Sequence, residues 1–95
     1  MRMMLRAQVD AIEGGKGLKS GATQKMIMGF VEKFKPEATF FTNTDGERSA
    51  IFVFDMKSSD AMPAICEGFF DLGWRVQLAP CMNVDDLQKG LAAAL

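Results

Sequence analysis

The sequence predicts an α+β domain in which two helices cover one face of a four-stranded antiparallel sheet. Two stretches with helical spacing alternate with four stretches of strand-forming residues, and the Asp45–Gly46 pair joins the second and third strands in a tight hairpin. Two right-handed crossovers complete the order strand, helix, strand, strand, helix, strand. This is the ferredoxin-like βαββαβ sandwich with sheet order 4-1-3-2. We expect one domain over residues 1–95, with a short helix at the C-terminal end.

The first 35 residues predict one strand, one connection and one helix. Apolar and polar side chains alternate over Met1–Val9, which is typical of a half-buried strand. The stretch Asp10–Gly21 contains four glycines and few apolar residues, so we expect a flexible connection there. From Thr23 to Phe34 apolar residues recur at three-to-four spacing, which predicts an amphipathic helix that ends before Pro36.

The second and third strands are expected over Glu37–Asn43 and Arg48–Met56, which are rich in Phe, Val, Ile and Thr. Phe40 and Phe41 point to opposite faces of the sheet, and the third strand is apolar on both of its faces. Two helices cover only one face, and a large exposed apolar patch is unusual on a monomer. We therefore expect a homodimer that forms through the uncovered sheet face.

The remaining elements are a helix, a strand and a final short helix. Ser58 or Ser59 is expected to cap the second long helix, which ends at Gly73, and Trp74–Pro80 is the fourth strand. Asn83 is expected to cap the final helix, because two aspartates follow it. The buried stripe of the second long helix is predicted to be Met62, Ile65, Cys66, Phe69, Phe70 and Leu72. One side of the final helix carries Val84, Leu87 and Leu91.

The composition excludes several classes of chemistry. The chain has no histidine and no tyrosine, so a Ser-His or Cys-His nucleophile pair and histidine-based zinc or haem ligation are excluded. We expect no metal and no cofactor, and the pattern identifies no catalytic residue. Eleven Lys and Arg residues against 12 Asp and Glu residues leave a formal net charge of -1, which predicts neither a nucleic acid nor a membrane partner.

The two cysteines and the absence of a long apolar run indicate where the protein resides. Cys66 and Cys81 lie in unlike contexts, which favours two reduced thiols over a disulfide. Cys66 is expected to serve packing, and Cys81 has no neighbouring basic residue in the sequence to activate it. No apolar stretch approaches the length of a membrane span. We expect a cytoplasmic protein.

Strand alternation places a candidate ligand site on the sheet face opposite the helices. Four polar side chains share that face on the first and fourth strands: Arg6, Gln8, Arg75 and Gln77. Guanidinium groups match carboxylate oxygens and amides orient the remaining polar atoms, so the predicted ligand is a small acidic or carbonyl-containing organic molecule. The alternative is that these arginines pair with Asp55, with Glu47 or with acids of a partner chain.

Two other stretches match known binding motifs only in part. The glycine-rich stretch Gly14–Ser20 is similar to a phosphate-binding loop, but Leu18 stands where that motif requires glycine. The third strand, Arg48–Asp55, matches the pattern of an RNA-recognition domain only in part, because Ala50 and Asp55 stand where stacking aromatics belong. RNA binding is therefore a remote alternative.

Taken together, the Asp-Gly hairpin, the Phe-rich third strand and the fourth strand Trp74–Pro80 followed by an acidic helix cap resemble the dimeric α+β barrel superfamily, in particular its small uncharacterised stand-alone members. The resemblance implies a barrel formed by two sheets, with the Arg and Gln side chains lining its interior. It also implies an alternative function, a cofactor-independent enzyme of monooxygenase or isomerase type. Haem enzymes of that superfamily use a histidine ligand, which this chain does not contain.

Overall fold

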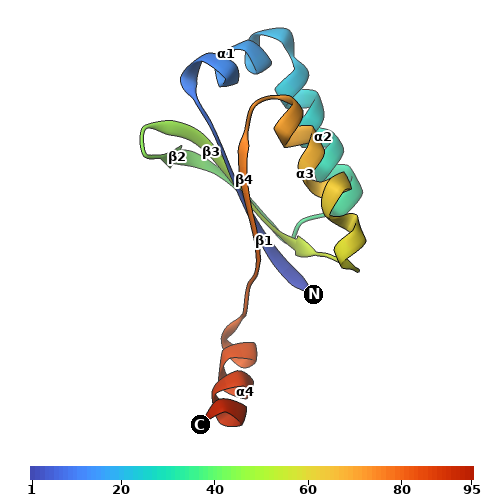
Figure 1. Ribbon diagram of the computed structural model, residues 1–95, viewed down its shortest axis with the longest axis vertical. Helices are drawn as coiled ribbons and strands as arrows, with labels where there is room; N and C mark the ends of the chain where they lie inside the picture. Colours follow the sequence, from blue (N-terminus) through green and yellow to red (C-terminus); the bar gives the residue numbers. More distant parts are fainter.

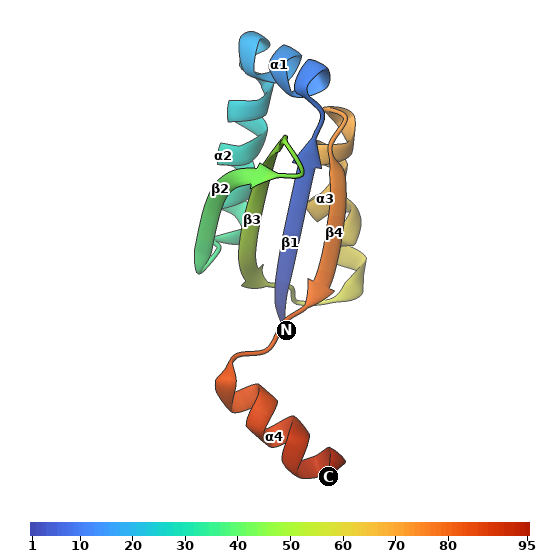
Figure 2. The ribbon, with the colours of Figure 1, turned by 90° about the vertical axis from the view of Figure 1, so that its left-hand side faces the viewer.

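A computed structural model describes residues 1–95 and contains the predicted four-stranded sheet. The strands are β1 (Arg2–Val9), β2 (Ala38–Thr44), β3 (Glu47–Asp55) and β4 (Arg75–Pro80). Their order is β2-β3-β1-β4 and every neighbouring pair is antiparallel (Figure 2). This is the predicted order read from the opposite edge, so the ferredoxin-like α+β fold is confirmed.

The helices divide the molecule into a covered face, an open face and a projecting arm. The helices are α1 (Ala11–Ser20), α2 (Ala22–Phe34), α3 (Met62–Asp71) and α4 (Val84–Ala94), and a 3₁₀ turn, η1 (Ser59–Ala61), precedes α3. Helices α2 and α3 lie over one face of the sheet, α1 lies at the end of β1 against α2, and no helix lies over the opposite face (Figure 1). Helix α4 extends away from the sheet and gives the molecule its 50 Å length.

Helix α1 corrects the predicted flexible connection over Asp10–Gly21. The Asp10 carboxylate accepts hydrogen bonds from the backbone N–H groups of Ile12 and Glu13, so it caps the start of the helix. Gly21 adopts a left-handed conformation with φ of 84° and its N–H donates to the Leu18 carbonyl, which ends the helix. The prediction was wrong because the caps at Asp10 and Gly21 stabilise the helix against the low helix propensity of the glycines between them.

Two of the glycines of α1, Gly14 and Gly17, allow the helix to pack closely against its neighbours. A Cβ atom at Gly17 would collide with the Thr23 hydroxyl oxygen of α2, and one at Gly14 would lie 2.9 Å from a Val9 side-chain carbon. Gly15, by contrast, has nothing within 4 Å of its Cβ position. The helix therefore needs glycine where it meets α2 and the end of β1.

The turn between β2 and β3, the end of α2 and the start of α4 agree with the sequence prediction. Asp45 and Gly46 have φ values of 52° and 77°, as a tight hairpin turn requires. Lys35 is also left-handed and ends α2 one residue before Pro36. Asn83 and Asp86 form a reciprocal capping box at the start of α4, with hydrogen bonds of 2.8 and 3.1 Å.

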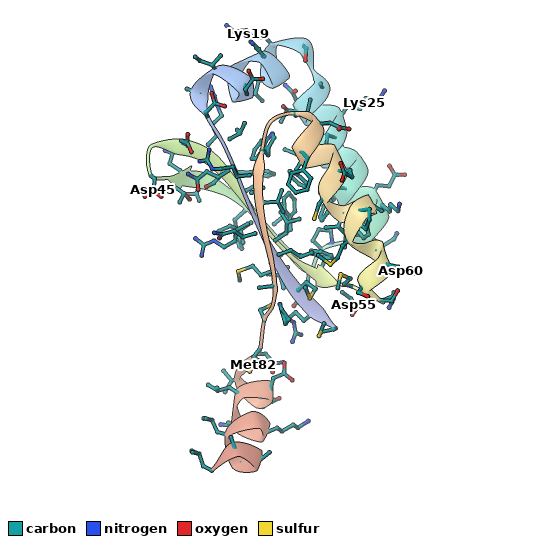
Figure 3. The ribbon with its side chains drawn as sticks, in the orientation of Figure 1. Lys19, Lys25, Asp45, Asp55, Asp60 and Met82 are labelled. Atoms are coloured by element: carbon teal, nitrogen blue, oxygen red, sulfur yellow. The ribbon has the colours of Figure 1, made fainter.

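The core lies between the sheet and helices α2 and α3. Phe30 of α2 lies between Phe52 of β3 and Phe69 of α3, with ring centroids 4.7 and 5.6 Å apart, and Trp74 packs edge-on against Phe69. Figure 3 shows the side chains that fill this layer. The buried apolar cluster consists of Met3, Leu5, Ala7, Val9, Phe30, Ala50, Phe52, Phe54, Met56, Ile65, Cys66, Phe69 and Trp74.

The start of α3 differs from the prediction. Neither predicted serine caps the helix, because the Ser58 hydroxyl bonds to the Asp60 carboxylate and the chain passes through η1 first. Of the predicted stripe, Ile65, Cys66 and Phe69 are buried. Met62 and Phe70 are exposed and Leu72 is half-buried, because β4 is an edge strand and no further element flanks α3 on that side.

Helix α4 makes little contact with the rest of the chain. Every residue of α4 is exposed, including the apolar side formed by Val84, Leu87 and Leu91. The start of the helix is held by Arg2 of β1, whose Nη1 lies 3.3 Å from Asp86 Oδ2. No helix of the protein is both long enough and apolar enough to span a membrane.

Candidate functional site

The predicted polar residues meet in one groove on the open face of the sheet. Strands β1 and β4 pair so that Gln8 lies opposite Arg75 and Arg6 lies opposite Gln77. All of them line a groove of about 340 Å³ that is bounded on its other side by β3 and the β2–β3 hairpin. The sequence therefore predicted which side chains come together and on which face.

The hairpin and β3 supply the rest of the groove. Figure 2 views the sheet from its open face, with the hairpin crossing in front of the ends of β3 and β1, and Figure 3 marks Asp45 at the tip of that hairpin. The groove residues from these elements are Thr44, Asp45, Ser49, Ala50 and Ile51. We call this hollow, with the four predicted residues, the open-face groove.

Glu47 organises one end of the open-face groove. Gln8 Nε2 donates to Glu47 Oε1 at 2.8 Å and to the Thr44 carbonyl at 3.2 Å, and the Arg75 guanidinium forms an ion pair with the same carboxylate. The hydrogen bond from Gln8, followed by the one from Arg75, lowers the pKa of Glu47 below its ordinary value. Glu47 is therefore a carboxylate that positions Gln8 and Arg75.

Arg6 differs from the other arginines of the chain. Arg2 pairs with Glu37 and Asp86, Arg75 pairs with Glu47, and Arg48 donates to the Ala11 carbonyl. Arg6 is exposed and makes no hydrogen bond or ion pair within the chain. The open-face groove thus contains one guanidinium group whose charge no carboxylate of the chain neutralises.

The hydroxyl groups beside the open-face groove bond to one another. Ser49 is only 7% exposed, and its Oγ donates to the Thr42 carbonyl at 3.1 Å and lies 2.9 Å from Thr44 Oγ1. Because Ser49 is the donor in the first bond, Thr44 is the donor in the second. These groups have their partners, so they shape the floor of the groove.

The rest of the open face is apolar. The Phe40 side chain lies opposite Ile51 and is 64% exposed. Met4 lies opposite Val53, and both of these side chains and Ile51 are half-buried with no helix above them. The open-face groove therefore adjoins an apolar strip, which we call the open-face strip and which consists of Met4, Phe40, Ile51 and Val53.

A second hollow lies where β1 and β4 meet the start of α4. Arg2 Nε pairs with Glu37 Oε1 at 2.6 Å, and the Asp55 carboxylate pairs with Lys57 and with the Met1 amino group, each at 2.6 Å. The hydrogen bonds from Lys57 and from the Met1 amino group lower the pKa of Asp55 to about 2. Cys81 is half-buried in this hollow, and the acids around it already pair with cations.

The thiols and acids do not form a reactive cluster. Cys66 of α3 is buried in the core, and burial raises the pKa of its thiol, which keeps it protonated at neutral pH. Both cysteines are free, and no group of three or more Cys, Asp or Glu side chains is placed to hold a metal ion.

Sequence reasoning placed Glu47 only as an alternative partner for an arginine, and the structure shows that it is the partner of Arg75. The contributions of Thr44 and Ser49 were not foreseen. A signal for them existed, because the Asp45–Gly46 turn sets a register in which Thr44 faces Glu47 and Thr42 faces Ser49.

No protein-family model matches the chain, and no curated protein matches it either. The resemblance to the dimeric α+β barrel superfamily therefore stays a prediction from the residues.

Proposed function

We propose that this protein binds a small organic acid, or a closely related carbonyl compound, in the open-face groove. The observation that carries the proposal is the unpaired guanidinium of Arg6 beside the amides of Gln8 and Gln77. A carboxylate accepts two parallel hydrogen bonds from a guanidinium, and the amides supply further donors and acceptors to its substituents. The apolar body of the ligand then contacts the open-face strip.

The neighbouring network supports this assignment because it leaves Arg6 available. The charge of Arg75 is balanced by its ion pair with Glu47. The Glu47 carboxylate accepts hydrogen bonds from Gln8 and Arg75, and it forms no ion pair with Arg6. Asp45 is the one acid among the residues that line the groove, and it forms no ion pair with Arg6. An incoming carboxylate is therefore the natural counter-ion for Arg6.

We further propose that two copies of the chain pair through their open faces. An exposed Phe40 ring beside half-buried Met4, Ile51 and Val53 gives each copy an apolar surface that the same surface of a second copy covers by two-fold symmetry. Such pairing encloses the open-face groove between two sheets. Removal of water strengthens the attraction between Arg6 and a carboxylate, because the effective dielectric constant falls.

The ligand proposal is tested by titration calorimetry with benzoate and benzamide. Benzoate carries the charge that Arg6 requires, and benzamide has the same shape without it. We expect benzoate to bind more tightly, and Arg6→Gln to weaken benzoate binding about tenfold or more while leaving benzamide unchanged. Arg48→Gln is the matched control, since Arg48 is an exposed arginine on the covered face. Equal binding of benzoate to wild type and Arg6→Gln would refute the proposal.

The dimer proposal is tested by light scattering coupled to size-exclusion chromatography at micromolar concentration. We expect a mass of two chains for the wild type and of one chain for Phe40→Glu, which places a charge in the open-face strip. Phe70→Glu is the matched control, because Phe70 is an exposed phenylalanine on α3, away from the open face. A wild-type protein that elutes as a single chain contradicts pairing but leaves the ligand assignment standing.

A further inference from the structure

Strand β2 is uncovered on both of its faces. It forms one edge of the sheet, and the helices make few contacts with it (Figure 2). Phe40 faces the open side and is 64% exposed, while Phe41, on the side of the helices, is 60% exposed. Phe52 of the neighbouring strand β3 lies on the same side as Phe41 and is fully buried. The helices therefore cover β3 but stop short of β2.

The sequence of β2 lacks the usual protection of an edge strand. Its seven residues, Ala38–Thr44, include no charged residue, no proline and no glycine. Strand β4, at the other edge of the sheet, carries Arg75 and ends at Pro80, which has no N–H group. A charged side chain or a proline hinders the addition of a further strand to an exposed edge. Of the two edges, β2 is therefore the one that is open to another strand.

Every second residue of β2 directs its backbone groups to this free edge. The Asp45–Gly46 turn has two residues, so the flanking residues Thr44 and Glu47 form a hydrogen-bonded pair. Along an antiparallel ladder such pairs alternate with pairs that are not hydrogen-bonded to each other. The residues of β2 whose N–H and C=O groups point away from β3 are therefore Thr39, Phe41 and Asn43.

We propose that β2 pairs with β2 of a second copy of the chain, in antiparallel orientation, so that two sheets join into one. A molecule that lies on the open face covers Phe40 alone. A strand alongside β2 carries side chains on both faces, so it covers Phe41 as well. The second copy supplies such a strand, uncharged and aromatic on both faces. The pairing uses the backbone of the sheet edge, so it is independent of the open-face groove and of pairing between open faces.

The register follows from the three residues that face the free edge. A two-fold axis through Phe41 places Phe41 opposite its own copy and Thr39 opposite Asn43 of the second copy. Each of the three then exchanges both backbone hydrogen bonds with the residue opposite. An axis through Phe40 or through Thr42 would leave one of the three without a partner inside the strand. The axis through Phe41 is therefore the register that pairs all of β2.

The side chains agree with this register. On the side of the helices the two Phe41 rings lie directly opposite each other, and on the open side each Phe40 is diagonal to its copy. Cross-strand aromatic pairs of this kind stabilise antiparallel sheets. Glu37 and Asp45 flank the strand, but Glu37 already pairs with Arg2 at 2.6 Å. Each end of the paired strands thus holds only one carboxylate without a cation.

Amide hydrogen exchange tests the pairing at single residues. The contact is one strand long, so we expect a dissociation constant of about 0.1–1 mM. The amides of Phe41 and Asn43 should then exchange about two- to fivefold more slowly in protein at about 1 mM than in protein at about 20 μM. The amides of Phe40 and Thr42 face β3 and are the internal control, whose exchange should not depend on concentration.

Cross-linking between copies tests the register. Thr39→Cys and Asn43→Cys, each in a Cys81→Ser background, are mixed and treated with dibromobimane, which joins thiols only at close range. We expect a two-chain product from the mixture. Either variant alone should give little, because residue 39 of one copy lies about 13 Å along the strand from residue 39 of the other. Gln77→Cys mixed with Ala79→Cys is the matched control at the β4 edge and should give none.

Light scattering from micromolar concentration to about 1 mM tests the role of Phe41. We expect the average mass of the wild type to rise about 1.5-fold or more over this range. Phe41→Lys places two like charges opposite each other and should abolish the rise, whereas Phe41→Val keeps a strand-forming residue and should retain it. The mass at micromolar concentration reports on the open face, so the two proposals can fail separately.

Three results would overturn the proposal. The first is a mass that does not rise up to about 1 mM. The second is exchange at Phe41 and Asn43 that does not depend on concentration, or that slows equally at Phe40 and Thr42. The third is equal cross-linking in the mixture and in the single variants, which would mean that residues 39 and 43 of two copies do not lie opposite each other.

Discussion

The two faces of the sheet differ in whether their polar side chains have hydrogen-bond partners. On the covered face, near α1, the hydroxyl of Thr23 and the indole of Trp74 are buried and lack partners. On the open face, Gln8, Glu47 and Arg75 are bonded to one another, and the Arg6 guanidinium is the arginine charge that stays unpaired. The comparison teaches that most polar groups beside the open-face groove bond to one another, whereas the polar groups buried beside α1 are left without partners.

The largest expected effect contrasts phenylalanines on the two faces. Phe52→Ala removes a fully buried ring from the aromatic cluster, and we expect it to lower the free energy of unfolding by about 3–5 kcal/mol. Phe40→Ala removes a ring that is mostly exposed in the single chain, so urea denaturation at low protein concentration should show a loss of about 1 kcal/mol or less. Similar losses for both variants would mean that the two faces do not differ in burial.

The next effect concerns α1, which closes the covered face. Gly17→Ala places a methyl group against the Thr23 hydroxyl, and we expect a loss of about 1–3 kcal/mol in thermal or urea unfolding. Gly15→Ala is the control: its Cβ meets nothing, so higher helix propensity should stabilise the protein by about 0.5–1 kcal/mol. The double variant Gly17→Ala/Thr23→Ala should recover part of the loss. Equal effects at both glycines would show that α1 does not pack as described.

A smaller effect is expected from the Glu47 network on the open face. Hydrogen bonds lower the pKa of Glu47, so its contribution to stability is present above the ordinary glutamate pKa and is lost as pH falls through the lower folded value. Gln8→Leu removes the largest cause, so the pKa of Glu47 should rise toward its ordinary value, and the loss of stability should be smaller and complete at a higher pH. Carboxyl carbon NMR during an acid titration measures the midpoint of Glu47, and urea unfolding over the same pH range measures the loss. A Glu47 midpoint that Gln8→Leu leaves unchanged would contradict the network.

The smallest effect is expected in α4. Leu91→Ser changes an exposed residue of a helix that contacts little else, so unfolding of the single chain should change by no more than about 0.5 kcal/mol. Asn83→Ala removes the capping box and should reduce the helicity of α4 in circular dichroism without a change in the main unfolding transition. A large loss of global stability from either variant would place α4 in the folded core.

Much of the fold could be predicted from local patterns in the sequence. Period-two alternation over Met1–Val9 and the Asp45–Gly46 turn determine the strand faces and the hairpin register, because side-chain direction in a strand is local geometry. The same alternation placed Arg6, Gln8, Arg75 and Gln77 on one face. The capping residue Asn83 and the end of α2 at Lys35 follow from local hydrogen bonding and from the proline after it.

By itself, then, the sequence determined the order of the elements, the sheet faces and the four polar side chains that meet on the open one. Only the tertiary structure decided that Gly17 is a packing residue, that Glu47 neutralises Arg75 and leaves Arg6 unpaired, and that the buried Thr23 hydroxyl and Trp74 indole lack partners. The physical reason is the separation along the chain of the residues that interact. Alternation and capping act over a few neighbouring residues, whereas burial, ion pairing and cavities depend on side chains that lie far apart in the chain.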